Sequence, residues 1–122
     1  MPVLMLVDDD PVVLNLMTRA LRDRGMHLLA FDLPLEALDR AKEPGFHMDV
    51  LLTDLAMPKM TGSVLASRLR ELHPEMRALF TSGYLDPDVL GSLPPDAQIL
   101  EKPFSVEQLR SFVDGAIEAS DV

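Results

Sequence analysis

The sequence predicts an α/β domain in which helices cover both faces of a five-stranded parallel sheet. Short apolar runs typical of buried strands alternate five times with segments of helical period. Because one helix separates each strand from the next, right-handed crossovers would make the strands parallel. In the third run, residues 50–53 all have the character of a strand buried on both faces.

The five strands are predicted at residues 3–7, 27–31, 49–53, 77–81 and 97–100. This number of strands suits the doubly wound order 2-1-3-4-5, in which the winding reverses between strands 1 and 3. Ligands of such sheets bind at the carboxyl ends of the strands near that switch point. The sequence therefore predicts a flavodoxin-like, three-layer (βα)5 architecture, with residues 1–122 forming one domain.

The first two helices have clear boundaries. Asp10 is a good N-cap, Pro11 is tolerated at the first helical position, and Gly25 ends the helix. The second helix begins at Pro34 and ends near Pro44-Gly45. The side chains expected to face the core are Val13, Met17, Ala20 and Leu21 in the first helix and Leu35, Leu38 and Ala41 in the second.

The last three helices differ in how strongly the local sequence favours a helix. The third begins after residues 61–63 and ends before Pro74, because the residue before a proline is disfavoured in a helix. The fourth, from Asp86, contains glycine and proline and should be the weakest, with about two turns. Ser105 and Gln108 form a capping box for the fifth. The expected inward residues are Leu65, Leu69 and Leu72 in the third helix and Leu109, Phe112, Val113, Ala116 and Ile117 in the fifth.

Composition excludes several classes of function. The net charge of -9 would repel a phosphate backbone, so nucleic acid is not expected as a direct partner. The absence of cysteine excludes disulfides, thiolate metal sites and a cysteine nucleophile. No apolar run approaches the roughly 20 residues of a membrane span, and Met1-Pro2 does not begin a signal peptide. We therefore expect a cytoplasmic protein without membrane contact.

Charged and polar residues follow the predicted strands. Asp8 and Asp9 follow the first strand, Asp54 the third, Ser82 the fourth and Lys102 the fifth. Three neighbouring carboxylates raise one another's pKa unless a cation compensates them, and Mg²⁺ is a hard cation suited to carboxylate oxygens. The sequence thus indicates a Mg²⁺-assisted phosphoryl site. The alternatives are a solvated acidic loop, an ordinary surface lysine and a serine that serves only the turn.

These residues resemble a known family. The matching motifs are Asp8-Asp9, Asp54 with Met57-Pro58 and Gly62, Ser82-Gly83 and Lys102-Pro103-Phe104. In this order and spacing they resemble the receiver domain of two-component response regulators, of the chemotaxis-regulator type, over nearly the whole chain. The last two motifs also resemble the receivers of hybrid sensor histidine kinases.

The resemblance implies a role for each site residue. Asp54 would accept a phosphoryl group from a phosphohistidine on a histidine kinase or phosphotransfer protein. Asp9 would bind Mg²⁺ directly, Asp8 mainly through water, and the backbone carbonyl of Ala56 would complete the protein ligands. Lys102 would pair with Asp54 and then with the phosphoryl group, and Ser82 would move to hydrogen-bond it. The domain would modify itself and would not be a turnover enzyme.

Two positions depart from the common pattern. Ile99 stands where many members of the family carry an aromatic ring that turns inward, which argues against a readout by a rotating ring. Tyr84 follows Ser82 by two residues and could shield the phosphoryl group, or it could only cover the loop surface. The switching surface, which could also form a weak homodimer, is expected around the fourth helix and the fifth strand.

Two other functions remain as alternatives. One is an interaction module of the same fold that is never phosphorylated, against which the complete set of acids, serine and lysine argues. The other is a Mg²⁺-dependent phosphohydrolase of the haloacid-dehalogenase type. That chemistry generally needs a second acid two residues after the nucleophile, where this chain has Ala56.

Overall fold

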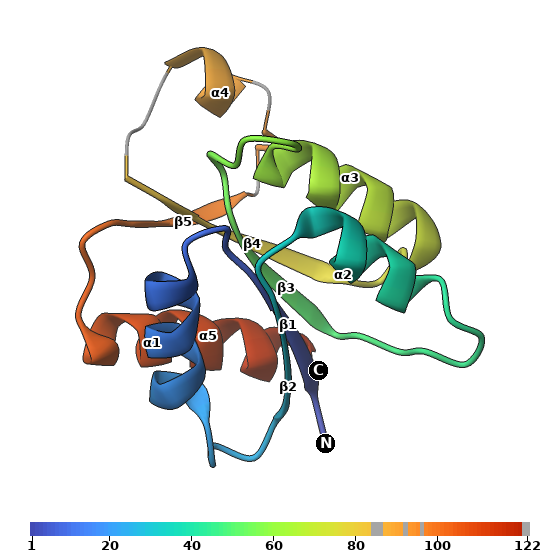
Figure 1. The fold of residues 1–122 in the computed structure, drawn as a ribbon. Coiled ribbons are helices and arrows are strands. Elements are labelled where there is room, and N and C mark those ends of the chain that lie inside the picture. Colours follow the sequence, from blue (N-terminus) through green and yellow to red (C-terminus); the bar gives the residue numbers. More distant parts are fainter. Residues whose placement is uncertain (84–86, 92, 96, 121–122) are drawn as a thin grey trace.

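The computed structural model describes residues 1–83, 87–91, 93–95 and 97–120, in which strands and helices alternate (Figure 1). They are β1 (Val3–Val7), α1 (Pro11–Leu21), β2 (His27–Phe31), α2 (Pro34–Ala41), β3 (Val50–Asp54), α3 (Gly62–Leu72), β4 (Arg77–Ser82), α4 (Pro87–Gly91), β5 (Gln98–Glu101) and α5 (Val106–Ser120). All strand pairs are parallel and the sheet order is β2-β1-β3-β4-β5. The predicted flavodoxin-like fold is confirmed.

Three strands extend one residue further toward the carboxyl edge than predicted. They end at Asp54, Ser82 and Glu101, because ladder hydrogen bonds continue past the apolar runs. The Leu55 amide donates to the Thr81 carbonyl at 2.9 Å, and the Lys102 amide donates to the Ser82 carbonyl at 2.8 Å. Asp54 and Ser82 are therefore held by the sheet itself.

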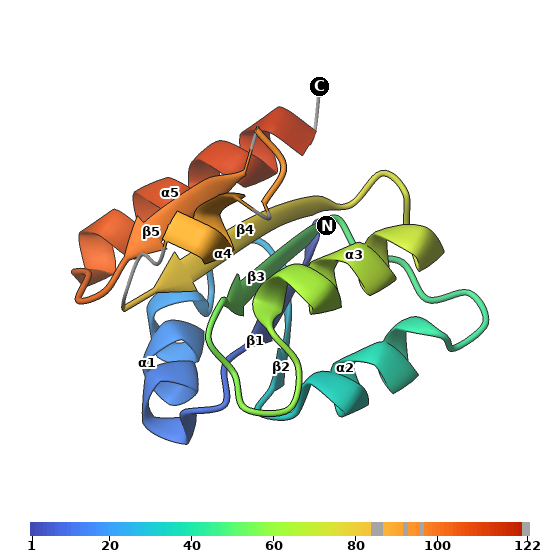
Figure 2. The same ribbon diagram turned by 90° about the horizontal axis from the view of Figure 1, so that it is seen from above.

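Helices pack on the two faces of the sheet to form two cores (Figure 2). One core, on the side of α1 and α5, contains Leu4, Leu6, Met17, Ala20, Leu21, Val50, Leu52, Leu79, Leu109, Val113 and Ala116. The other, on the side of α2 and α3, contains Met5, Val7, Ala37, Leu38, Ala41, Met48, Leu51, Leu55, Met57, Leu65, Ala66, Leu69, Met76 and Phe80. The alternation along each strand decides which core a residue joins.

Two of the predicted helix caps, at Asp10 and at Ser105, are present, and Thr61 caps α3 in addition. The Asp10 carboxylate accepts from the Val12 amide at 2.9 Å, and Thr61 Oγ1 accepts from the Val64 amide at 3.3 Å. Ser105 and Gln108 form the reciprocal capping box, with bonds of 2.8 and 3.0 Å. None of the described helices combines the length and apolarity that crossing a bilayer requires.

Two predicted inward positions are wrong. Leu35 is 56% exposed and Leu72 is 42% exposed. Pro34 is itself buried and α2 turns Ala37 and Leu38 toward the sheet, which leaves Leu35 outside. In α3 the buried positions include Ala66, while Leu72 lies in the last turn.

The predicted limits of other helices also need correction. α1 ends at Leu21, before the predicted Gly25, with Arg22 as its C-cap. α2 ends at Ala41, before the predicted Pro44-Gly45, with Lys42 as its C-cap. The fourth helix, α4, has five residues and is shorter than the predicted two turns. Its expected cap, Asp86, lies outside the described residues.

Candidate functional site

Three carboxylates converge at the carboxyl edge of the sheet. Asp8 and Asp9 follow β1, Asp54 ends β3, and one oxygen from each lies within 4.8 Å of the others. Asp8 is fully buried and Asp54 is 6% exposed, whereas Asp9 is exposed. The cluster is therefore buried on one side and open to solvent at Asp9.

The turn after β1 fixes the direction of Asp8. Its Oδ1 accepts a hydrogen bond from the Asp10 amide at 2.9 Å, and its own amide donates to the Phe31 carbonyl at 3.2 Å. Asp10 in turn caps α1. The three consecutive aspartates thus occupy three different environments.

Lys102 brings a positive charge to the cluster from β5. Its Nζ lies 3.1 Å from Asp8 Oδ2 and 3.6 Å from Asp54 Oδ1. The shorter contact is to Asp8, while the sequence had suggested pairing with Asp54. The ammonium therefore lies between two buried carboxylates. The Lys102-Pro103 peptide bond is cis.

Burial raises the pKa of the Asp54 carboxyl above its ordinary value. Lys102 and the backbone amide of Ala56 lower the pKa, whereas the charges of Asp8 and Asp9 raise it. The net shift is upward, so the Lys102 ammonium does not offset the burial of Asp54 together with the charges of its two acidic neighbours. A divalent cation with oxygen ligands would supply the missing positive charge, and the donor set fits Mg²⁺.

The other predicted site residues lie at the same edge of the sheet. Ser82 is 1% exposed at the end of β4, and its carbonyl accepts from the Lys102 amide. Ala56 is exposed two residues after Asp54.

The two positions that depart from the family pattern are Ile99 and Tyr84. Ile99 is partly buried against the core on the α2 and α3 side. Tyr84 lies outside the described residues, so its shielding role stays a prediction.

Gly62 has a structural role that the sequence pattern did not reveal. A Cβ at this position would lie 2.2 Å from the Asp54 carbonyl oxygen and 3.0 Å from the Leu55 Cα. The Gly62 amide also donates to the Leu55 carbonyl at 2.9 Å. The start of α3 therefore packs directly on the backbone that carries Asp54. The sequence hinted at this contact only through the glycine at the start of the predicted helix, which belongs to the same motif as Asp54.

Comparison with known proteins identifies the family. The family model described as the response regulator receiver domain matches residues 4–114. The chain belongs to the response regulator receiver domain family. This agrees with the resemblance seen in the motifs and places the chain in two-component signalling.

Two curated relatives show how the receiver domain occurs in longer and shorter chains. This chain is 36% identical over 119 residues to the sensor kinase CckA of Brucella abortus, and the match covers 96% of this chain but 13% of that protein. It is 33% identical over 121 residues to the response regulator receiver protein CpdR of the same organism, covering 96% of this chain and 98% of that protein.

Solved structures share the fold of the receiver domain. A response regulator receiver protein from Sinorhizobium medicae WSM419 superposes with a TM-score of 0.85 at 28% identity, covering 98% of this chain and 96% of that one. The signal receiver domain of an HD domain-containing protein from Pseudomonas fluorescens Pf-5 superposes with a TM-score of 0.87 at 20% identity. That match covers 98% of this chain and 97% of the other. At that lower identity the likeness shows the fold alone.

Proposed function

We propose that this chain is a single receiver domain that accepts a phosphoryl group on Asp54 from the phosphohistidine of a histidine kinase or phosphotransfer protein. The observation that carries the proposal is the convergence of Asp8, Asp9, Asp54 and Lys102 at one edge of the sheet. Membership of the receiver family supports the same role.

The transfer is a nucleophilic substitution at phosphorus. An Asp54 carboxylate oxygen forms a bond to phosphorus while the phosphorus–nitrogen bond of the phosphohistidine breaks, and the imidazole leaves with the bonding electron pair. The product is an acyl phosphate on Asp54. Such transfers depend mainly on positioning and on compensation of the charge on the phosphoryl oxygens.

The residues of the site suit that requirement. Asp9, Asp54 and the Ala56 carbonyl would hold Mg²⁺ directly, with Asp8 acting mainly through water. When bound, Mg²⁺ supplies charge compensation for the phosphoryl oxygens. Lys102 is close enough to both buried carboxylates to follow the new charge on Asp54. The Ser82 hydroxyl would hydrogen-bond a third phosphoryl oxygen.

The surface beside the cluster suits a protein donor. α1 begins directly after Asp10, and it exposes Val12 by 75% and Leu16 by 48%. These residues are one helical turn apart, so they share a face. We infer that the donor protein contacts this face while its phosphohistidine approaches the cluster past the exposed Asp9.

We further propose that phosphorylation changes the surface formed by α4 and β5, which could also mediate a weak homodimer. The hydrogen bond from the Lys102 amide to the Ser82 carbonyl links the phosphoryl site to the end of β5. α4 is a short helix of five residues, and weakly packed elements are those that move most readily. Contacts made in only one state would bias the position of this surface.

Labelling with a small acyl phosphate and Mg²⁺ tests the proposal. Intact-mass measurement should show the addition of one phosphoryl group to the wild type and none to Asp54→Asn. An unlabelled wild type would favour the interaction module. Rapid consumption of the donor without a stable label would favour a phosphohydrolase, which the alanine at position 56 already makes less suitable.

A further inference from the structure

The end of β4 carries a buried hydroxyl group that the proposed function does not use. Thr81, the penultimate residue of β4, is 0% exposed, and its Oγ1 has no hydrogen-bond partner within the part of the chain that the structure describes. Its carbonyl, in contrast, accepts from the Leu55 amide at 2.9 Å. An unpaired hydroxyl inside a protein lowers the stability of the folded state and is uncommon, so its presence here needs a reason.

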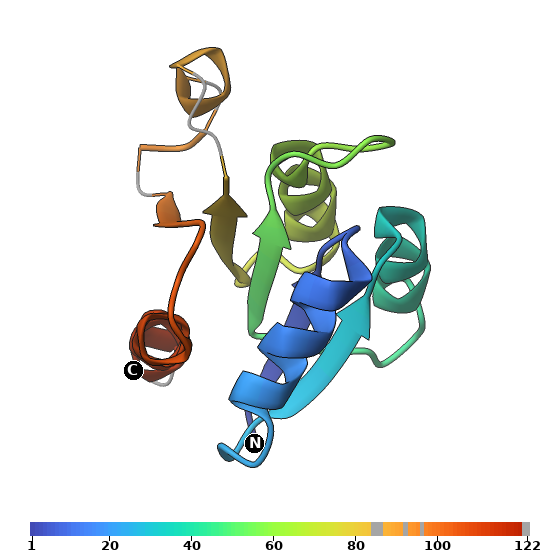
Figure 3. The ribbon, with the colours of Figure 1, turned by 60° about the vertical axis from the view of Figure 1, so that its left-hand side comes forward.

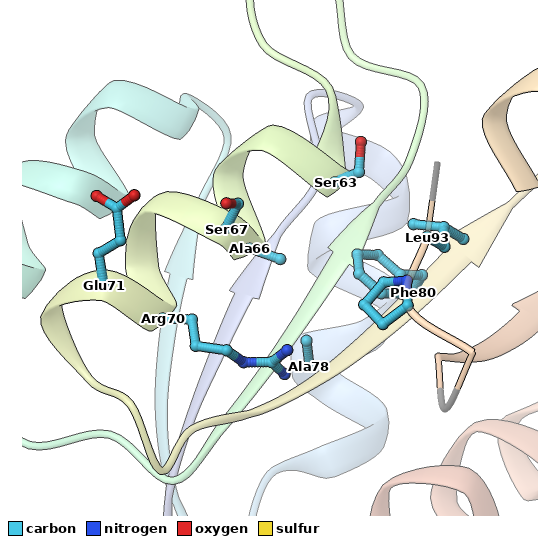
Figure 4. Close-up of a pocket in the computed structure, with 9 residues that line it drawn as sticks. Ser63, Ala66, Ser67, Arg70, Glu71, Ala78, Phe80 and Leu93 are labelled. Atoms are coloured by element: carbon cyan, nitrogen blue, oxygen red, sulfur yellow. The ribbon is translucent and has the colours of Figure 1, made fainter. Parts of the chain in front are cut away.

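The side chain of Thr81 lies on the same face of the sheet as that of Asp54. α3 and α5 lie on opposite sides of β4 (Figure 3), and Ala78 and Phe80 line a hollow on the side of α3 (Figure 4). Because side chains alternate along a strand, Thr81 faces the side of α5. Asp54 pairs with Thr81 in the ladder between β3 and β4, and residues paired in this way point to the same face. Thr81 is therefore the lateral neighbour of the proposed phosphoacceptor.

The Lys102 side chain crosses the carboxyl end of β4. β4 lies between β3 and β5, and Lys102 follows β5, yet its Nζ lies 3.6 Å from Asp54 Oδ1 and 3.1 Å from Asp8 Oδ2. Thr81 pairs with Leu100, two residues before Lys102, so Thr81 and Lys102 belong to the same face of the sheet. Thr81 is therefore on the strand that separates the two residues of the Lys102–Asp54 ion pair.

A phosphoryl group on Asp54 would change the surroundings of the Thr81 hydroxyl. Lys102 would follow the new charge, so its ammonium would move away from the carboxyl oxygens that it approaches here. Neighbouring strands lie about 4.8 Å apart, so rotation about the Cα–Cβ bond of Thr81 is enough to bring its hydroxyl within hydrogen-bonding range of Asp54. The Asp54 carboxyl oxygen that is not bonded to phosphorus can accept such a bond.

We propose that Thr81 is a positioning residue: its hydroxyl, unpaired among the described residues here, donates to an Asp54 carboxyl oxygen once Asp54 carries a phosphoryl group. The inference rests on the proposed phosphorylation of Asp54. Because the bond gives a partner to a buried hydroxyl only in the phosphorylated domain, Thr81 favours that state over the unphosphorylated one. The role is distinct from that of Ser82, which would bind an oxygen of the phosphoryl group itself.

Thermal unfolding of the unphosphorylated chain gives the first measurement. Thr81→Val keeps the shape of the side chain and removes the unpaired hydroxyl, so Tm should rise by a few degrees. The matched control is Thr53→Val, because Thr53 is also 0% exposed but its hydroxyl donates to the Asp54 carbonyl at 3.1 Å. That variant loses an existing hydrogen bond, so its Tm should fall. Thr81→Ser keeps the hydroxyl and loses a buried methyl group, so its Tm should also fall.

Binding of beryllofluoride, a stable analogue of a phosphoryl group on a carboxylate, gives the second measurement. In ¹⁹F NMR titrations with Mg²⁺ present, Thr81→Val should bind the analogue on the order of tenfold more weakly than the wild type. Thr81→Ser, which retains the hydroxyl, should bind it within about twofold of the wild type. The two variants should therefore rank in opposite order for Tm and for binding of the analogue. A purely structural role of Thr81 would change both quantities in the same direction.

A crystal structure of the wild type with beryllofluoride should place Thr81 Oγ1 within about 3.0 Å of an Asp54 carboxyl oxygen. A hydroxyl bonded elsewhere, unchanged affinity in Thr81→Val, or a Tm of Thr81→Val below that of the wild type would each overturn the proposal. Acyl-phosphate labelling of the wild type keeps the two proposals separate. A wild type that takes up neither label nor analogue would refute both, whereas a labelled wild type that Thr81→Val matches in affinity would refute the role of Thr81 alone.

Discussion

β3 and β5 belong to one sheet and carry the two ends of the central ion pair, yet they are packed very differently. Every residue of β3 is buried, while none of β5 is. Asp54 therefore extends from a strand enclosed by neighbours, and Lys102 follows a strand at the edge. The carboxylate is held in place by the core, and its positive partner follows a strand whose residues are all at least partly exposed.

The largest contrast in unfolding free energy should appear when one leucine side chain in each strand is shortened to alanine. Leu52→Ala in β3 removes a fully buried side chain and should lower the free energy of unfolding by about 3–5 kcal/mol. Leu100→Ala in β5 removes a partly buried one and should cost only about 1–2 kcal/mol. Urea unfolding measures both, and equal losses would remove the distinction between the strands.

The contact between α3 and β3 gives the next largest effect. Gly62→Ala places a methyl group against the Asp54 backbone and should cost about 1–3 kcal/mol. It should also slow acyl-phosphate labelling, because Asp54 must shift. The control is Gly115→Ala in α5, where a Cβ meets nothing within 4 Å and the helix should gain up to about 1 kcal/mol. A neutral Gly62→Ala would show that β3 is less rigid than argued.

Lys102 tests the contribution of the edge strand. Lys102→Met leaves two buried carboxylates without their ammonium partner. Removing one partner of a fully buried pair costs about 3–5 kcal/mol, but Lys102 is 23% exposed, so we expect about 1–2 kcal/mol. Millimolar Mg²⁺ should reduce the loss measured by thermal unfolding. The same loss with and without Mg²⁺ would argue against a shared cation site.

The smallest effect concerns the charge of Asp54. Its raised pKa means that the folded state holds the proton more tightly than the unfolded state, so Asp54 lowers stability increasingly as the pH rises above 3.8 through its folded pKa. Without Mg²⁺, Asp54→Asn should raise Tm by a few degrees at pH 7, and the gain should shrink toward acid pH. Mg²⁺ should stabilise the wild type more than the variant. A gain independent of pH would exclude this explanation.

The sequence predicted the fold well because local patterns determine most of it. The apolar runs and the caps at Asp10 and Ser105 are recognisable from neighbouring residues, and the strand order follows from the doubly wound rule. The motifs also placed Asp8, Asp9 and Asp54 together. The roles assigned to individual site residues remain predictions, which the labelling experiment tests.

What the sequence could not predict depends on contacts across space. The rotation of α2 about its axis, which leaves Leu35 exposed, is set by how Pro34 and Ala37 pack against the sheet. The shorter contact of Lys102 with Asp8 depends on the register between β1 and β5 through three intervening pairs of strands. The approach of Gly62 to Asp54 has no counterpart in any local pattern.

The turn after β1 shows that identical neighbours need not be interchangeable. Asp8 is enclosed beside an ammonium, Asp9 faces water, and Asp10 begins a helix. Replacing each in turn by asparagine removes the same single charge, yet the first change would disturb an internal ion pair, the second would weaken cation affinity, and the third would leave a serviceable cap. A mutational scan of this tripeptide would therefore separate architecture, metal affinity and helix initiation within three adjacent codons.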